Sequence, residues 1–179
     1  SYTHNCYGAN IIGSTSGSGS LQVLCDNQYS CRNTDITCPT GTGSCHLQCN
    51  GDNTCDIGTT IAWTEGNSNL LYCSAATSSC GHFDYPPPLS PNTSLTVLCD
   101  GSYECENLIF TCPSNAACTI RCTGSNSCQN AVIWCPSNAP CNIQCTGSNS
   151  CLRTVAHWSE NGQAIPACTT DCNLMEVPS

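Results

Sequence analysis

The sequence predicts an all-β fold, a disulfide-rich β-solenoid with coils of about 23 residues and about seven coils in total. The first observation is the cysteine spacing: from Cys99 the gaps run 6, 7, 6 and 4 residues, and this series then repeats. Coil starts follow at Cys122, Cys145 and Cys168, and an earlier set lies at Cys25, Cys49 and Cys73. Such a period is too short for a pair of helices and suits one turn of a solenoid.

The second observation is an alternating pattern within each coil. In CTIRC (118–122), CNIQC (141–145) and CHLQC (45–49), every second residue is Cys, Ile or Leu. Side chains two residues apart share one face of a strand, so these residues should point inward. A second strand is predicted in NTDITC (33–38), NLIFTC (107–112) and NAVIWC (130–135). Its predicted inward residues are Ile36 with Cys38, Phe110 with Cys112, and Ile133 with Cys135.

A larger duplication divides the chain. Residues 21–39 and 95–113 are identical at 11 of 19 positions, which indicates two related modules. Turn-forming PSNA and TGSN segments separate the predicted strands within them. The predicted organisation is a flexible N-terminal arm (1–20), a first solenoid module (21–82), a Pro-rich glycosylatable spacer (83–94), a second solenoid module (95–172) and a C-terminal tail (173–179).

Degenerate coils indicate which cysteines pair. In one coil the third and fourth cysteine positions hold Trp63 and Asn69, and in another they hold Trp158 and Ala164. Both cysteines are therefore lost together. Joint loss suggests a bonded pair, because an orphaned thiol would react or mispair. Pairing between neighbouring coils remains the alternative. The predicted bonds are Cys25–Cys31, Cys38–Cys45, Cys49–Cys55, Cys73–Cys80, Cys99–Cys105, Cys112–Cys118, Cys122–Cys128, Cys135–Cys141, Cys145–Cys151 and Cys168–Cys172.

The odd number of cysteines leaves Cys6 unpaired or available for an interchain bond. With 21 Cys in 179 residues, the chain has the composition of a disulfide scaffold, which predicts an extracellular, secreted protein. The net charge of −9 opposes binding to nucleic acid. No apolar run is long enough to predict insertion into a membrane.

Tryptophans and modification signals supply the remaining candidate residues. Trp63 and Trp158 should fill the volume that a disulfide vacates, whereas Trp134 should face outward as an interface or ligand residue. Asn92 begins an Asn-Thr-Ser sequon in the spacer, and Thr93 and Ser90 are further glycosylation candidates. The stretch PPPLSP (86–91) resembles glycan-bearing motifs of algal and plant wall proteins.

Signals for chemistry are weak. No catalytic phrase surrounds any histidine, and the acidic Glu104, Glu106 and Asp100 have no equivalents in the first module apart from Asp26. An enzyme is therefore not expected, and no catalytic residue is predicted. Cysteine gaps of this kind favour disulfides over zinc ligands, and no loop presents dense oxygen ligands for calcium. No metal and no cofactor are expected.

By the style of its repeats over 21–172, the chain resembles cysteine-rich repeat proteins of protist and algal coats, walls and flagellar hairs. The resemblance implies a structural role: a rigid extracellular subunit of a filament or surface coat. Identical subunits, joined head-to-tail, are then the expected partners. The alternative is a secreted carbohydrate-binding module or adhesin with glycan partners, and a polysaccharide-active β-helix enzyme ranks third.

Overall fold

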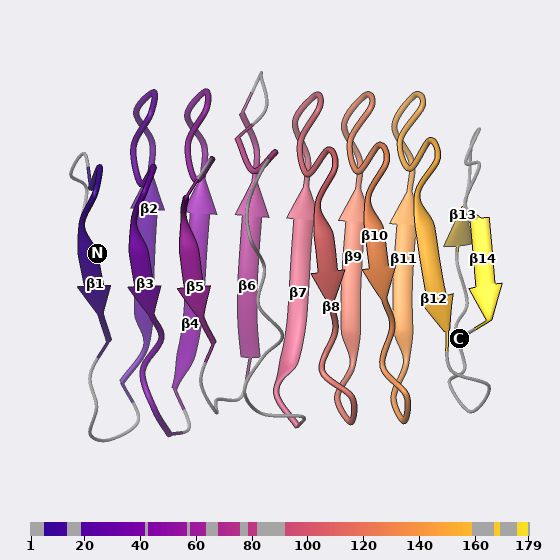
Figure 1. Cartoon of the computed structure of the whole chain (residues 1–179), viewed down its shortest axis with the longest axis horizontal. Coiled ribbons are helices and arrows are strands. Elements are labelled where there is room, and N and C mark those ends of the chain that lie inside the picture. Colours follow the sequence, from indigo (N-terminus) through magenta and orange to yellow (C-terminus); the bar gives the residue numbers. More distant parts are fainter. Residues whose placement is uncertain are drawn as a thin grey trace.

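A computed structural model describes residues 6–13, 19–41, 43–56, 58–63, 68–75, 79–81, 92–158, 167–168 and 175–178. Within these ranges the protein is all-β: the described chain forms strands and turns and contains no helix. A helix able to cross a membrane is accordingly not found among them. The strands form three parallel sheets that wind into a solenoid, as the sequence predicts (Figure 1).

The longest sheet has seven strands, one at each predicted coil start. Its register places cysteine over cysteine, since Cys25 pairs with Cys49, Cys49 with Cys73 and Cys73 with Cys99. The repeat in the sequence is therefore the repeat in space. In chain order its strands are β2 (Leu21–Cys25), β4 (Ser44–Cys49), β6 (Ser68–Cys73), β7 (Ser94–Cys99), β9 (Cys118–Cys122), β11 (Cys141–Cys145) and β13 (Ala167–Cys168).

The predicted second strands form two shorter sheets that run in the opposite direction to the long sheet (Figure 1). One contains β1 (Asn10–Ile12), β3 (Asp35–Thr37) and β5 (Thr60–Ala62). The other contains β8 (Ile109–Thr111), β10 (Val132–Trp134), β12 (Val155–Trp158) and β14 (Met175–Pro178).

Both predicted terminal segments contain a strand. The sequence predicts a flexible arm over 1–20, but β1 within it pairs in register with β3. The predicted tail over 173–179 likewise contains β14, which pairs in register with β12. Both segments extend the shorter sheets because a parallel sheet edge offers unpaired backbone groups to any strand that follows the same direction.

Among the described residues five coils are complete, against the seven that the sequence predicts. They start at β2, β4, β7, β9 and β11, and each contains a long strand followed by a strand of a shorter sheet, before the terminal β13 and β14. The coil of β6 continues into 82–91, outside the described residues, where most of the predicted spacer also lies. Strand β6 nevertheless pairs with β7 over six residues, so the long sheet runs without a break from the first module into the second.

The core is a narrow column between two walls of strands. The long sheet contributes buried aliphatic side chains such as Val97, Ile120 and Ile143. The shorter sheets contribute Ile36, Ile61, Phe110, Ile133 and Ala156 from the opposite wall. The inward assignments of Ile36, Phe110 and Ile133 are thus confirmed, and Trp63 is buried as predicted. The Trp158 side chain lies outside the described residues.

Candidate functional site

Nine of the ten predicted disulfides are present in the structure, and all nine close a loop within one coil. Six of them join the first and second cysteines of a coil and form a turn that we call a clip. Side chains of the tenth pair, Cys168 and Cys172, lie outside the described residues. So many disulfides are typical of an oxidising, extracellular-type environment.

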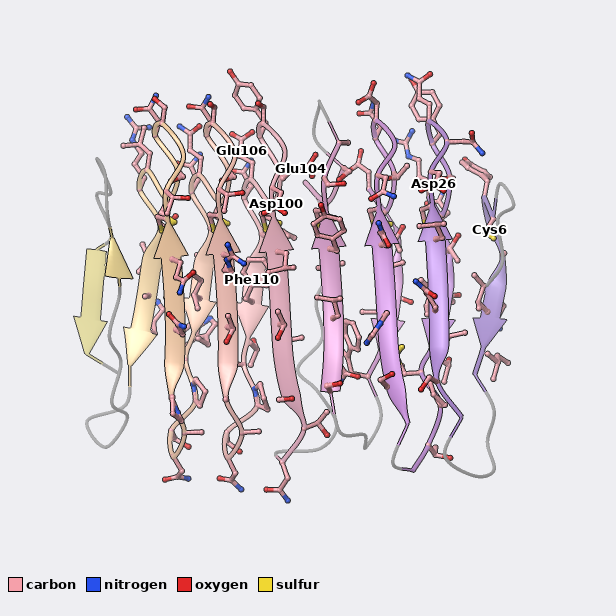
Figure 2. All side chains as sticks on the ribbon, turned by 180° about the vertical axis from the view of Figure 1, so that it is seen from behind. Cys6, Asp26, Asp100, Glu104, Glu106 and Phe110 are labelled. Carbon is pink, nitrogen blue, oxygen red and sulfur yellow. A yellow bond between two sulfur atoms is a disulfide. The ribbon has the colours of Figure 1, made fainter. Side chains whose placement is uncertain are left out.

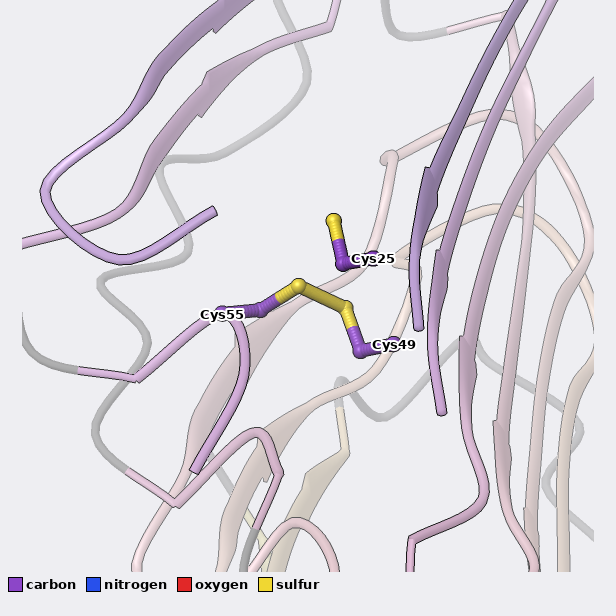
Figure 3. Close-up of side chains that lie close together, drawn as sticks. All are labelled: Cys25, Cys49 and Cys55. Atoms are coloured by element: carbon purple, nitrogen blue, oxygen red, sulfur yellow. A yellow bond between two sulfur atoms is a disulfide. The ribbon is translucent and has the colours of Figure 1, made fainter. Parts of the chain in front are cut away.

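The clips stack closely along the solenoid. The sulfurs of Cys25, Cys49 and Cys55 lie within 4.8 Å of one another (Figure 3). Three close sulfur atoms resemble a metal site, but Cys49 is bonded to Cys55 and Cys25 to Cys31. A disulfide sulfur offers no thiolate, and the thiolate is the form that binds metal. These clusters are therefore stacked covalent bonds.

Each clip has an unusual backbone. In the clip from Cys122, residues Asn126, Cys128 and Asn130 have φ values of 56°, 54° and 56°. Their N–H groups alternate between neighbours: Asn126 and Asn130 donate to the following coil and Cys128 to the preceding one. Left-handed residues are costly outside glycine, and the intercoil hydrogen bonds and the disulfide hold them in place. The sequence gives only a weak signal of this, in the recurrent Asn.

The acidic side chains serve hydrogen-bonded ladders along the solenoid. Asp26 accepts a hydrogen bond from Asn50 (2.7 Å), and Asp100 accepts one from Thr123 (2.7 Å), each across one coil. Figure 2 labels Asp26, Asp100, Glu104 and Glu106 on the clip side of the molecule. Glu104 is fully buried whereas Glu106 is partly exposed, so this pair of carboxylates does not face a common solvent-filled site.

Glu104 occupies a buried position that recurs in every described clip, and it differs from the other clips in residue type. The residue before the second cysteine is Ser or Thr in the other described clips, as in Ser127, whose hydroxyl donates to the Gly124 carbonyl (2.8 Å). Glu104 instead reaches the preceding coil, where its Oε2 accepts hydrogen bonds from the Ser79 N–H (2.9 Å) and hydroxyl (2.5 Å). Burial raises the pKa of Glu104 to about 7, against the lowering effect of these Ser79 hydrogen bonds.

Trp134 faces outward as predicted and is 43% exposed. Its ring stacks on that of His157 in the next coil, with the centroids 3.9 Å apart and the planes 9° apart. One ring face is therefore covered by a neighbour of the same chain, which limits its use as a platform for a sugar ring. The register places Thr111 beside it in the preceding coil.

The Trp134–His157 stack should contribute modestly to stability. Aromatic pairs contribute about 1 kcal/mol beyond the area they bury, and both rings here are partly exposed. We expect a double-mutant cycle of Trp134→Ala and His157→Ala, measured by denaturant unfolding with intact disulfides, to give a coupling of about 1 kcal/mol. Additive effects of the two substitutions would contradict the stack.

Amide ladders decorate the turns. Asn138 donates to Asn115 (3.0 Å), Asn115 to Asn92 (3.4 Å) and, elsewhere, Asn130 to Asn107 (3.3 Å). Asn92 is exposed just before β7, so its place in the fold is compatible with the predicted glycosylation. Thr93 is only 2% exposed, and burial of its hydroxyl opposes a glycan there. Ser90 lies outside the described residues.

Cys6 is the one free cysteine among the described residues, and its partly exposed side chain packs against the end of the core. Figure 2 places it at the terminal coil, away from the clips of the second module.

Comparisons with known proteins find no matching family, no matching curated protein and no matching solved structure.

Proposed function

We propose that this protein is an extracellular structural protein, a rigid disulfide-stapled subunit of a filament or surface coat that assembles head-to-tail. The observation that supports this proposal most directly is the common direction of the strands in each sheet. All strands of a sheet are parallel, and the strands at the two ends of the solenoid, β1 and β2 at one end and β13 and β14 at the other, each pair on one side only within the described residues.

Parallel sheets make the two ends of the solenoid complementary. The end that carries β14 can pair with the β1 end of another copy in the same direction and by the same hydrogen bonding. Such a contact joins two different surfaces of the same molecule. It produces an open polymer unless the rotation between successive copies closes a ring. Solenoids that remain monomeric usually cover their ends with a polar cap, and the described residues contain no capping helix.

The side chains favour a structural role as well. Asp26 and Asp100 are engaged in intercoil ladders, Glu104 is buried, and the cysteines of the clips are bonded. These side chains are used within the fold, which supports a structural role. Its secretion to a surface or wall is part of the proposal.

Negative-stain microscopy of concentrated protein tests the proposal. We expect filaments one solenoid wide that lengthen with protein concentration. A charged substitution on the outer edge strand, Ile11→Lys, should shorten them because Ile11 packs against the end of the core. As a control, Thr96→Lys introduces the same charge on β7, the central strand of the long sheet, and should leave assembly unchanged. A strictly monomeric protein at all concentrations would contradict the proposal.

A secreted carbohydrate-binding module is the second candidate. The ladders Asn92–Asn115–Asn138 and Asn107–Asn130 present amide groups at the surface, and amides bond readily to sugar hydroxyls. A glycan array separates the two functions. Selective binding that is lost in Asn115→Ala would favour the module, and absence of binding would favour the structural role.

A further inference from the structure

The fifth residue of each clip, counted from its first cysteine, recurs at one place in successive coils. We call these residues the clip tips. All the described tips have a left-handed backbone, with φ between 53° and 61°: Tyr29, Asn53, Tyr103, Asn126 and Asn149. The tip of the clip from Cys73 lies outside the described residues.

Backbone hydrogen bonds hold the tips in register. The N–H groups of Tyr29, Tyr103 and Asn126 donate to carbonyls of the following coil, at 3.2, 3.0 and 2.8 Å. Because neighbouring strands of a sheet are about 4.8 Å apart, the tips form a row along one edge of the solenoid. Strand order places the coil of Tyr103 three strands beyond that of Tyr29, so roughly 14 Å separates the two tyrosines along the row.

The two tyrosines are not explained by the conformation of the clips. Asparagine tolerates a left-handed backbone, whereas a residue as bulky as tyrosine is an outlier there. Tyr29 and Tyr103 occupy the same position in the two duplicated segments (21–39 and 95–113), and they are 45% and 47% exposed. A strained position whose side chain contributes little to the core indicates a role outside the fold.

The side chains of the tips are available to a ligand. Within the described part of the chain, no hydrogen bond engages the tip phenols or the tip amides, whereas the amides of the turn ladders, such as Asn138 and Asn115, bond to each other. The one cation over a tip ring among these residues is Arg32, 5.9 Å from the centre of the Tyr29 ring. Each tyrosine therefore has an open ring face.

We propose that the row of clip tips binds an extended, uncharged polysaccharide. The tyrosine rings stack on the apolar faces of sugar rings, and the tip amides of Asn53, Asn126 and Asn149 bond to sugar hydroxyls. A row of evenly spaced groups suits a polymer of repeating units. None of the described tips is charged, and the net charge of −9 repels anionic polymers. The inference adds a ligand to the structural role and does not need head-to-tail assembly.

Affinity electrophoresis of the full chain tests the inference. The acidic protein migrates toward the anode in a native gel, and a polysaccharide cast in the gel retards it if the two bind. The probes are three uncharged polymers, hydroxyethylcellulose, galactomannan and arabinoxylan, and the control polymer is anionic polygalacturonate. We expect at least one uncharged probe to retard the native protein. Retardation by none of them, or stronger retardation by polygalacturonate, would overturn the inference.

The matched variants are Tyr29→Asn and Tyr103→Asn, alone and together. Asparagine is the residue of the other described tips, so the free energy of unfolding should stay equal or rise. We expect the dissociation constant for the polymer to rise about tenfold or more in the double variant, since both stacking rings are lost. The double variant Tyr29→Phe with Tyr103→Phe keeps the rings and should bind like the native protein. Tyr72→Ala, on the outer face of the long sheet, should bind like it too.

Two outcomes for the double asparagine variant would contradict the role of the tyrosines. Undiminished binding would show that the rings do not contact the polymer, and a lower free energy of unfolding would show that they serve the fold. A protein that binds the polymer through Tyr29 and Tyr103 but never forms filaments would support the inference and contradict the proposed head-to-tail assembly.

Discussion

Gly124→Ala is expected to destabilise the protein by about 3 kcal/mol, near the upper end of the range for overpacking in a well-packed interior. A Cβ at Gly124 would overlap the carbonyl oxygen and carbon of Gly101, which are backbone atoms of the preceding coil. The coil that contains Gly124 cannot move away from the preceding coil, because next to this contact the Thr123 N–H donates to the Cys99 carbonyl at 3.0 Å. The coils must separate locally, and intercoil hydrogen bonds lengthen on both sides.

Denaturant unfolding with intact disulfides measures this loss, and hydrogen exchange locates it at the clips of Cys99 and Cys122. The matched control is Asn27→Ala. It stands at the equivalent place in the first clip, where a Cβ is already accommodated, so its effect should stay within 0.5 kcal/mol in either direction, as at ordinary surface positions. A loss for Gly124→Ala as small as that of the control would show that the coils tolerate a wider spacing.

Glu104 is expected to make the stability depend on pH between about 4.5 and 7. Burial raises the pKa of this carboxyl from 4.5 to about 7 in the folded protein. Below pH 4.5 the group is protonated in both states, so its ionisation does not lower the free energy of unfolding. As the pH rises toward 7 the unfolded chain loses the proton while the folded one keeps it, so stability falls. The full loss, reached above pH 7, is about 3 kcal/mol from the size of this shift.

Glu104→Gln removes the ionisation and keeps the shape, including a carbonyl oxygen that can accept the hydrogen bonds from Ser79. Its free energy of unfolding should match that of the native protein at pH 4 and exceed it by about 3 kcal/mol at pH 8. Glu106→Gln, which removes a partly exposed carboxylate from the same segment, should retain the native pH dependence. Parallel pH profiles for the native protein and Glu104→Gln would contradict the role of Glu104.

The module junction explains why a carboxyl is found there. The clip of Cys73 and Cys80 is one residue longer than its neighbours, and the Glu104 side chain extends into that coil to bond with Ser79. A serine at position 104 would bond only within its own turn, as Ser127 does. The carboxyl thus connects the coil with the longer clip to the coil that follows it, and the free energy needed to keep it buried rises with pH.

The sequence by itself determined the solenoid and the coil starts, because each coil must return its chain to the same place. The joint loss of the third and fourth cysteines in the coils of Trp63 and Trp158 favoured a bond between those two positions, whereas pairing between coils was decided against only by the structure. Alternation within a strand likewise predicts that Phe110 and Ile133 point inward while Trp134 points outward, since the period of a strand is two.

Only the tertiary structure decided what happens between coils. Several features depend on a neighbour 20 to 25 residues away: the left-handed backbone of the clips, the place of Asn10–Ile12 and Met175–Pro178 in the shorter sheets, the burial of Glu104 and the stacking of His157 on Trp134. The correspondence of Cys6 with Cys31 also emerges only from the register of β1 with β3. A repeat in sequence sets the shape of one coil, whereas contacts with adjacent coils select the conformation of each exceptional residue.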